Sequence, residues 1–215
     1  MVYAPLGAPQ QETALHHLSR SLTLSEKIGD RLGQAGAHFV LGFAWTLRND
    51  YRQALSHITD AGNMYRDLGN SKWESRSSSM MGACHTRLGH HDKASTYCES
   101  ALKLCQQHGD VYGQADSLEN LGAIAVTTKR PADALRHYEQ ALALWRDVDN
   151  TYRQAGVLTT LGDTHRDLRH HEQARQAWQQ AVDLYRNQNL EPTAARIEQR
   201  LADLTKIGLP SRHRT

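Results

Sequence analysis

Small and large apolar residues recur along the chain with a period of 40 residues that continues without insertions across most of the sequence. In one half of each period, small residues recur at two positions and large residues at two others; each recurring position is called a column. The small columns are Ala14, Ala54, Ala94, Ala134 and Ala174, followed seven residues later by Ser21, Ala61, Ala101, Ala141 and Ala181. The large columns are Leu18, Ile58, Cys98, Tyr138 and Trp178, and then Leu24, Met64, Leu104, Leu144 and Leu184. The spacing i, i+4, i+7, i+10 predicts one amphipathic helix in each of these half-periods.

The other half of each period carries a Leu-Gly or Met-Gly pair with a small residue six positions before it. The pairs are Leu41-Gly42, Met81-Gly82, Leu121-Gly122 and Leu161-Gly162, and the small residues are Ala35, Ser75, Ala115 and Ala155. These columns predict a second helix that packs closely on the first. The large aromatic residues that fall on core columns are expected to be structural, and they are Trp45, Trp145, Trp178, Tyr65 and Tyr185.

Glycine and capping residues divide the period into helices. Gly29, Gly69 and Gly109 each suit a left-handed helix end, and the Asp or Asn after each glycine can cap the next helix. Asp50 and Pro131 mark turns inside the period. Together these signals predict ten helices, at about residues 10–28, 31–48, 51–68, 71–88, 91–108, 111–128, 131–148, 151–168, 171–187 and 192–206.

Neither helix of such a pair can bury its apolar face alone, so consecutive pairs are expected to stack into one continuous α-solenoid. The Leu-Gly pair, the alanine columns and the closing Gly-Asp or Gly-Asn resemble the tetratricopeptide repeat (TPR), in the form of about 40 residues seen in kinesin light chains. The resemblance covers residues 11–206 and implies an all-α, right-handed solenoid of stacked antiparallel helix pairs. The stretch "ALALWRDVDNTYRQAGVLTTLGD" is also similar to the C-terminal TPR regions of actinobacterial multidomain transcriptional regulators.

Two turns inside helix pairs depart from the family pattern. Arg48 with Asn49, and Thr128 with Lys129, stand where the family usually has Leu-Gly. These two hairpins are therefore expected to close less tightly than the others.

The repeat also predicts the domain organisation. Residues 1–10 are expected to be disordered or vector-derived, residues 11–208 to form the solenoid and residues 209–215 to form a flexible tail. The repeat hairpins are 31–70, 71–110, 111–150 and 151–190, with an unpaired first helix at 11–29 and a polar capping helix at 191–207. The first helix has an apolar face around Leu15, Leu18, Leu22 and Ile28 without its usual cover. Either the chain is a fragment of a larger protein, which we favour, or a second copy covers that face.

In TPR proteins the first helix of each pair lines a concave groove, and the resemblance implies which side chains point into it. They are Phe39, Phe43 and Leu47 in the first pair, Arg76, Ser79 and Arg87 in the second, Asp116 and Glu119 in the third, and Asp163, Arg166 and Asp167 in the fourth. Such a groove is aromatic at one end, basic in the middle, where the arginines could hold a carboxylate or phosphate, and mostly acidic at the other end. An extended or helical segment with an apolar anchor, an acidic group and a basic group would complement it. The alternative is that these charges only solvate an exposed face.

Composition narrows the classes of partner. Lys and Arg number 25 against 23 for Asp and Glu, so a formal net charge of +2 gives no strong attraction to nucleic acid or anionic lipid. No apolar run approaches the roughly 18 residues that a membrane span needs, and the N-terminus lacks a signal-peptide pattern. A soluble, cytoplasmic protein is expected, and Cys84, Cys98 and Cys105 are expected to be reduced core thiols.

A histidine-rich stretch, "LGDTHRDLRHHEQA", raises the question of a metal site. Its histidines are His165, His170 and His171, and they recur 80 residues earlier as His85, His90 and His91. The intervening pairs have Trp45 and Ala125 in the first of these columns, which is a packing position, and the other two columns fall at a turn. We therefore expect no native metal site and at most adventitious nickel or zinc binding.

The sequence thus predicts a binding module. No phosphate-cradling glycine loop, HExxH motif or paired CxxC motif is present, so neither an enzymatic activity nor a cofactor is expected. The leading hypothesis is a protein- or peptide-binding TPR module, as the sensing or interaction region of a bacterial transcriptional or signalling regulator, with its ligand in the concave groove. The alternative is a scaffold that forms homodimers through residues 11–29.

Overall fold

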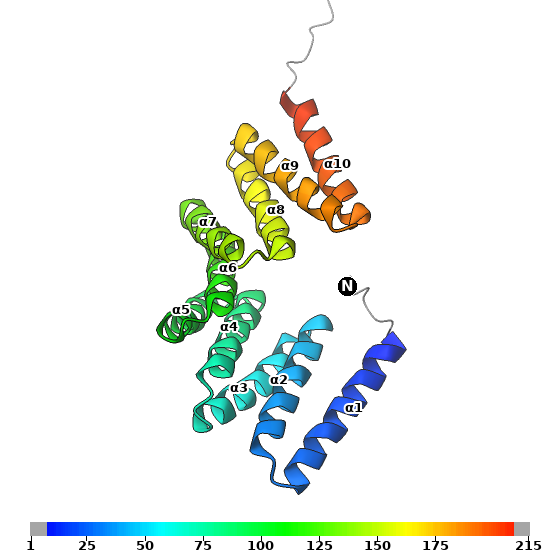
Figure 1. Cartoon of the computed structure of the whole chain (residues 1–215), viewed down its shortest axis with the longest axis vertical. Coiled ribbons are helices and arrows are strands. Elements are labelled where there is room, and N and C mark those ends of the chain that lie inside the picture. Colours follow the sequence, from blue (N-terminus) through cyan, green and yellow to red (C-terminus); the bar gives the residue numbers. More distant parts are fainter. Residues whose placement is uncertain (1–7, 209–215) are drawn as a thin grey trace, which may run out of the picture. The chain divides into compact units, whose positions relative to one another are not determined.

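Ten α-helices make up the described part of the chain, residues 8–208 of this computed structural model, and that part contains no strand (Figure 1). The helices are α1 (Ala8–Lys27), α2 (Arg31–Leu47), α3 (Tyr51–Asp67), α4 (Ser71–Arg87), α5 (His91–His108), α6 (Val111–Thr127), α7 (Pro131–Asp147), α8 (Thr151–Asp167), α9 (His171–Asn187) and α10 (Glu191–Gly208). Each begins and ends within two residues of its predicted bounds. The all-α repeat architecture predicted from the sequence is therefore confirmed.

The two predicted terminal segments fall mostly outside the described residues. Residues 1–7 and the predicted flexible tail, 209–215, are not described. Residues 8–10, which the sequence assigns to the N-terminal segment, form the first turn of α1. No helix in the described range is long and apolar enough to cross a membrane.

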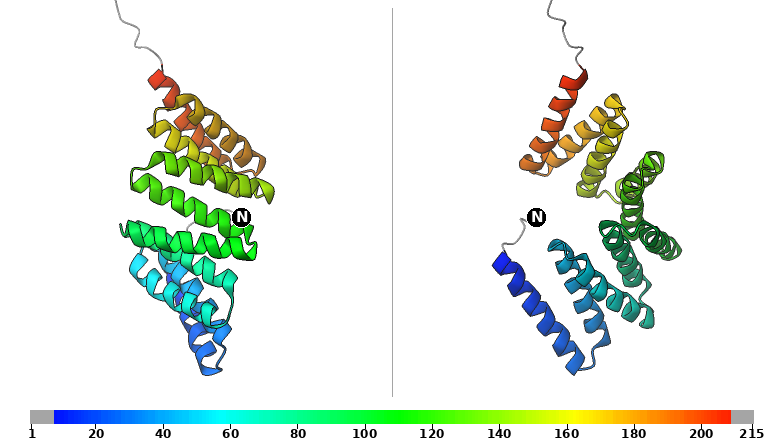
Figure 2. Two further views of the ribbon diagram at one scale, coloured as in Figure 1. Left: turned by 90° about the vertical axis from the view of Figure 1, so that its left-hand side faces the viewer. Right: turned by 180° about the vertical axis from the view of Figure 1, so that it is seen from behind.

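The helices group into two compact units, which divide after Asn120, inside α6. In the first unit α1 packs on α2, α2 on α3, α3 on α4 and α4 on α5. In the second unit α7 packs on α8, α8 on α9 and α9 on α10. Within each unit, successive helices run in opposite directions and are joined by short turns (Figure 2).

The small columns of the repeat form the helix contacts. The alanines of the second-helix columns from Ala54 to Ala181 are fully buried, as are Ala35, Ala115 and Ala155 in the first helices. A Cβ added to Gly42 or Gly162 would collide with the side chain of Ile58 or Trp178, respectively, which comes from the following helix. Helices of a pair can therefore approach this closely only because glycine occupies the column.

The predicted core aromatics are buried, with one exception. Trp145, Trp178, Tyr65 and Tyr185 are buried. Trp45 is only half-buried, and the Arg48 guanidinium lies 5.4 Å from its ring centroid. The column of Trp45 is therefore only partly buried in α2, as it is at His85 and His165, whereas Ala125 in the same column is buried.

Caps and left-handed residues end the helices where the sequence predicts. The side chains of Asp30, Asp50, Asn70 and Asn150 each accept a hydrogen bond from the backbone N–H three residues later. Gly29, Gly69 and Gly109 have φ of 72°, 65° and 67°.

The turns expected to close less tightly keep the same backbone hydrogen bonds as their glycine-containing counterparts. Asn49 and Lys129 adopt φ of 60° and 57°. The Asp50 N–H donates to the Trp45 carbonyl at 3.1 Å and the Arg130 N–H to the Ala125 carbonyl at 2.8 Å, against 2.9 Å for His90 to His85. The expectation of looser hairpins is therefore wrong, because the left-handed residue is accommodated without opening the turn.

Candidate functional site

Three large apolar side chains lie exposed on one face of α2. Val40, Phe43 and Leu47 are 44%, 48% and 60% exposed, and their spacing of three and four residues places them side by side on the helix. The sequence pattern predicted Phe43 and Leu47 as ligand contacts but not Val40, which the same spacing could have revealed. These three residues are called the α2 apolar face below.

Phe39, also predicted as a ligand contact, has a different position. Its ring packs edge-on against Trp73 of α4, with centroids 5.0 Å apart. Trp73 in turn stacks on Tyr65 of α3 at 5.7 Å, and all three border the buried Ala35 and Ala61. Phe39 is half-buried, so it mainly holds α2 against α3 and α4.

The two predicted groove arginines of α4 each lie over an aromatic ring. The Arg76 guanidinium is 4.9 Å from the centroid of Trp73. The Arg87 guanidinium is 5.4 Å from the centroid of Tyr51, and its Nε donates to the Tyr51 hydroxyl at 3.0 Å. Eleven residues of helix separate the two arginines, about 16 Å along the axis. They are therefore two separate cationic points and cannot hold one carboxylate or phosphate between them.

The other predicted residues of the first unit are less exposed. Ser79 is buried, and its hydroxyl accepts a hydrogen bond from the Asn120 amide at 2.9 Å, so it connects α4 to α6 and offers little surface to a ligand. Asp116 and Glu119 are half-buried. Arg76 and Asp116 act with opposite sign on the pKa of the buried Cys105 thiol. Asp116 of α6 thus acts at the same thiol as Arg76 of α4, in addition to the two arginines expected in the middle of the groove.

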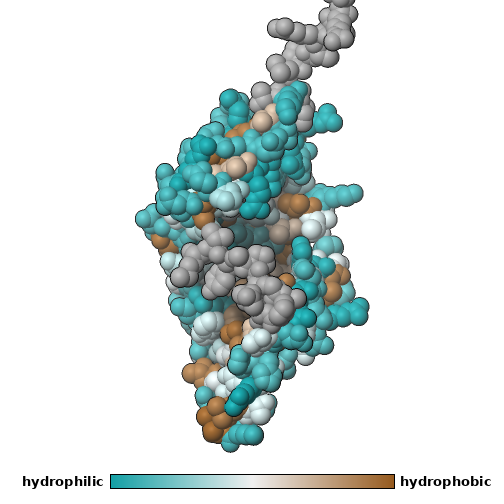
Figure 3. Space-filling model, turned by 90° about the vertical axis from the view of Figure 1, so that its right-hand side faces the viewer, coloured by the Kyte–Doolittle hydropathy of each residue, from teal (hydrophilic) through white to brown (hydrophobic). Residues whose placement is uncertain are grey.

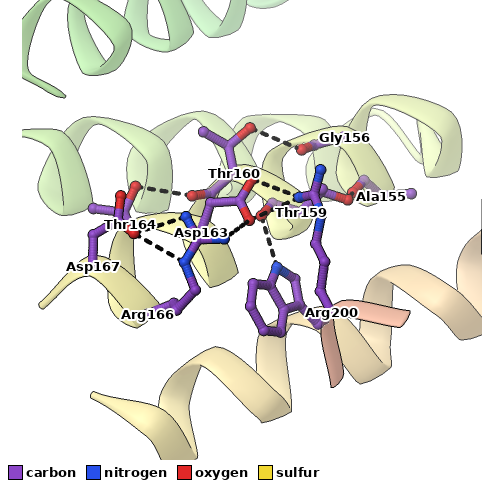
Figure 4. Close-up of polar contacts among 10 residues, drawn as sticks. Ala155, Gly156, Thr159, Thr160, Asp163, Thr164, Arg166, Asp167 and Arg200 are labelled. Carbon is purple, nitrogen blue, oxygen red and sulfur yellow. Dashed lines mark hydrogen bonds and ion pairs between the residues drawn. The ribbon is translucent and has the colours of Figure 1, made fainter. Parts of the chain in front are cut away.

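The predicted acidic end of the groove is neutralised by arginine (Figure 4). Both Asp163 oxygens accept hydrogen bonds from Arg200 Nη1 of α10, at 2.7 and 2.6 Å. Arg166 Nη1 lies 3.6 Å from Asp163, and Arg166 also donates to Asp167 through Nε at 2.9 Å and Nη2 at 2.7 Å. The pattern did not identify Arg200, because its partner lies 37 residues away in another helix. This surface is an ion-pair network and not an unpaired acidic patch.

A second exposed apolar group surrounds the turn between α1 and α2. Leu24 and Ile28 are 59% and 69% exposed, and Leu32 is exposed beside them. Apolar surface gathers at this end of the molecule, at the lower tip of Figure 3. Of the face predicted to lack a cover, Leu15 is buried, and Leu18 and Leu22 are half-buried. The exposed apolar surface of α1 therefore lies at its C-terminal end.

Hollows in the surface lie away from the predicted groove residues. One of about 500 Å³ lies between α9 and α10, lined by Glu172, Arg175, Gln176, Gln179, Gln180, Leu201 and Ala202. Another of about 420 Å³ lies at the turn between α4 and α5, lined by residues 89–93. Both are open to solvent, so neither resembles an enclosed small-molecule site.

The histidines singled out in the sequence pair across turns. His85 Nδ1 lies 3.3 Å from His90 Nδ1, and His165 Nδ1 lies 3.4 Å from His170 Nδ1. Burial, and then the neighbouring histidine, lower the pKa of both His85 and His165. His85 also stacks on Tyr97 at 5.4 Å, consistent with the packing role expected for this column. Within the described residues, no group of three or more His, Cys, Asp or Glu side chains is arranged to hold a metal ion.

The three cysteines are buried and reduced. Burial raises the pKa of the Cys84 thiol to about 11 and that of Cys98 to about 12. Cys105 is shifted in the same direction by burial. All three are thus protonated at neutral pH, which disfavours a nucleophilic role.

Solved structures with the same fold come from several kinds of protein. BtubC (BKLC) from P. vanneervenii is 18% identical with a TM-score of 0.70, over 95% of this chain and 96% of that one. Aspartyl phosphate phosphatase F from Bacillus subtilis is 12% identical with a TM-score of 0.77, over 84% of this chain and 48% of that one. A Rap protein complexed with competence and sporulation factor is 17% identical with a TM-score of 0.61, over 92% and 59%. At these identities the likeness establishes the fold alone.

Sequence comparison identifies the family. Curated protein sequences give no significant match. The family model described as tetratricopeptide repeat matches residues 73–147 and again residues 113–187. Since these matches together span more than half of the sequence, the chain belongs to the tetratricopeptide repeat family.

Proposed function

We propose that this chain binds a protein or peptide segment through the α2 apolar face, and that it acts by binding and not by catalysis. TPR arrays are in general protein-interaction scaffolds, and the fold likeness to a Rap protein complexed with competence and sporulation factor supports a peptide as one class of ligand. The observation that carries the proposal is the exposure of Val40, Phe43 and Leu47 on one helix face. Removing such side chains from water stabilises a complex by about 1.5–3 kcal/mol for each one fully buried.

Arginines beside this face suggest the rest of the ligand. Arg48 follows Leu47 directly, and Arg87 is held on Tyr51, the first residue of α3. A guanidinium already positioned on a ring loses little side-chain entropy when it binds a carboxylate. The ligand we propose therefore has an apolar anchor followed by an acidic group.

The exposed ends of α1 and α2 favour one alternative, a homodimer. Leu24, Ile28 and Leu32 form a second apolar group distinct from the α2 apolar face. A second copy of the chain would remove these side chains from water.

We further propose that the module belongs to a bacterial, cytoplasmic regulator. The resemblance of residues 141–163 to actinobacterial regulators supports this assignment.

A pair of matched variants separates the two proposals. A displayed random-peptide library is selected on the full chain, and the affinity of the best peptide is measured by fluorescence anisotropy. Phe43→Asp is expected to weaken binding by about 30-fold, since loss of a hot-spot residue costs on the order of 2 kcal/mol. Leu24→Asp, at an exposed leucine outside the α2 apolar face, is expected to leave peptide affinity unchanged.

The opposite pattern would contradict the peptide proposal. If Phe43→Asp binds the selected peptides as well as the parent chain does, the α2 apolar face is not the contact surface. Light scattering on the same variants tests the homodimer: a parent dimer that Leu24→Asp converts to a monomer supports it, and a monomeric parent at tens of micromolar rejects it.

A further inference from the structure

We propose that His38 and His57 bind a divalent transition-metal ion of the zinc class, which links α2 to α3 in the first hairpin. The Nδ1 atoms of the two rings face each other 3.1 Å apart. The rings are 5.2 Å apart between centroids and inclined at 45°. The two residues are 19 positions apart in sequence, and only the antiparallel packing of α2 on α3 brings them together.

The separation of the two nitrogens suits a metal ion. Zinc binds histidine nitrogen at about 2.0–2.1 Å, so two nitrogens 3.1 Å apart subtend an angle of about 100° at a shared ion, close to the tetrahedral value. A direct contact between neutral rings requires one Nδ1 to donate and the other to accept, which fixes both tautomers. A bound ion instead accepts a lone pair from both Nδ1 atoms, which requires each ring to carry its proton on Nε2.

A carboxylate adds favourable charge beside the pair. Asp60 Oδ2 lies 3.7 Å from His38 Nδ1, and Asp60 is one helical turn after His57 on α3. Asp60 also acts electrostatically on His57. The site is therefore a pair of nitrogen ligands with a carboxylate close by, and water completes the coordination.

Burial distinguishes this pair from the two turn pairs. The His38 side chain is 13% exposed, whereas the contact between His85 and His90 and that between His165 and His170 are exposed. In addition, Lys93 acts on His85 with a positive charge. A part-buried pair loses less rotamer freedom on binding than an exposed one, so the hairpin pair is expected to bind the ion more tightly than either turn pair.

The test uses the full untagged chain in a background that lacks the turn pairs. His90→Asn and His170→Asn remove both, and asparagine is a residue that caps helices elsewhere in this chain, at Asn70 and Asn150. His38→Leu is then added, because Leu118 and Leu158 occupy the same column of later repeats and are buried there. Circular dichroism confirms that each variant folds.

Zn²⁺ titration by calorimetry and Co²⁺ absorption give the decisive readouts. The background chain is expected to bind about one Zn²⁺ with release of protons, to raise its unfolding temperature with Zn²⁺, and to give a Co²⁺ d–d spectrum. His38→Leu is expected to lose all three, and Asp60→Asn to weaken binding by about tenfold. The proposal is overturned if the background chain shows no saturable uptake, or if folded His38→Leu binds Zn²⁺ as tightly as the background does.

Discussion

The exposed sides of α2 and α8 occupy equivalent columns of the repeat and yet differ in chemistry. Phe43 and Leu47 of α2 correspond to Asp163 and Asp167 of α8, which lie three periods, or 120 residues, later in the sequence. The apolar pair is exposed, whereas Asp163 is bound by Arg200 and Asp167 by Arg166. A partner that covers α2 gains free energy by removing apolar surface from water, but one that covers α8 must compete with existing ion pairs. The same scaffold therefore offers a binding surface at one position and a satisfied surface at the other.

Close packing beneath the two surfaces is expected to be the same, and substituting the shared glycine tests this. Gly42→Ala and Gly162→Ala would each force a Cβ into Ile58 or Trp178, with an expected loss of about 1–3 kcal/mol of unfolding free energy. Gly36→Ala and Gly156→Ala, on the same helices, meet only Tyr65 Oη at 3.8 Å and Tyr185 Oη at 3.9 Å. These controls are expected to gain up to about 1 kcal/mol from helix propensity.

Urea unfolding of the four variants provides the measurement. Destabilisation by Gly162→Ala but not by Gly42→Ala would show that α2 is less tightly packed than α8. The difference between the two exposed faces would then reflect packing as well as surface chemistry.

Equivalent turns in the two units can be compared through their N-caps. His90 and His170 are the N-cap residues of α5 and α9, and their side chains make no capping hydrogen bond, whereas the side chains of Asn70 and Asn150 cap α4 and α8. In buffer with a chelator, His90→Asn and His170→Asn are each expected to stabilise by about 0.5–1 kcal/mol. Asn70→Ala and Asn150→Ala, as matched controls, should lose about 1 kcal/mol. Thermal unfolding gives the sign, and a loss of stability in either asparagine variant would mean that the histidine pair stabilises that turn.

Breaking the ion pair between Asp163 of α8 and Arg200 of α10 is expected to lower the free energy of unfolding only slightly. Arg200→Leu removes the guanidinium whose Nη1 donates to both Asp163 oxygens, and because both groups are part-exposed the expected cost is about 0.2–1 kcal/mol at low salt. That cost should decrease when NaCl is raised. Arg175→Leu, which breaks the more exposed pair with Glu172, is the control and should cost less.

The smallest effect is expected on the α2 apolar face itself. Phe43→Ser and Leu47→Ser should change the free energy of unfolding by less than about 0.5 kcal/mol, because both side chains are exposed in the unbound chain. The readout is the urea midpoint of each variant against that of the parent chain. A loss well above that value would show that these residues belong to the core and would remove the argument that a partner covers them.

The fold could be predicted from the sequence because it depends on local, periodic information. The repeat columns that contain Ala54, Ala61 and Gly42 predict two helices per period. Capping residues such as Asp50 and Asn70 predict where the helices begin. The burial of these columns follows directly from the period. The left-handed turns at Asn49 and Lys129 were harder to judge, since the packing of the hairpin decides whether that backbone is tolerated.

The candidate site could be predicted only in part, because contacts between distant residues decide it. The repeat columns indicated that Phe43 and Leu47 face outward, and both are exposed. They did not indicate that Phe39 packs against Trp73 or that Ser79 is buried and hydrogen-bonded to Asn120. Neither Arg200 beside Asp163 nor His57 beside His38 follows from spacing, since each pair joins two helices. Periodicity indicates which way a residue faces, but only the structure shows which residue it meets.

Amide hydrogen exchange of the full chain, with and without a peptide selected on it, tests the central claim most directly. If the α2 apolar face is the contact surface, the peptide should slow exchange in α2 around residues 36–47, and Phe43→Asp should abolish that protection. Exchange in α8 should be unchanged. Protection confined to α8 and α10, or protection of α2 that persists in Phe43→Asp, would contradict the account.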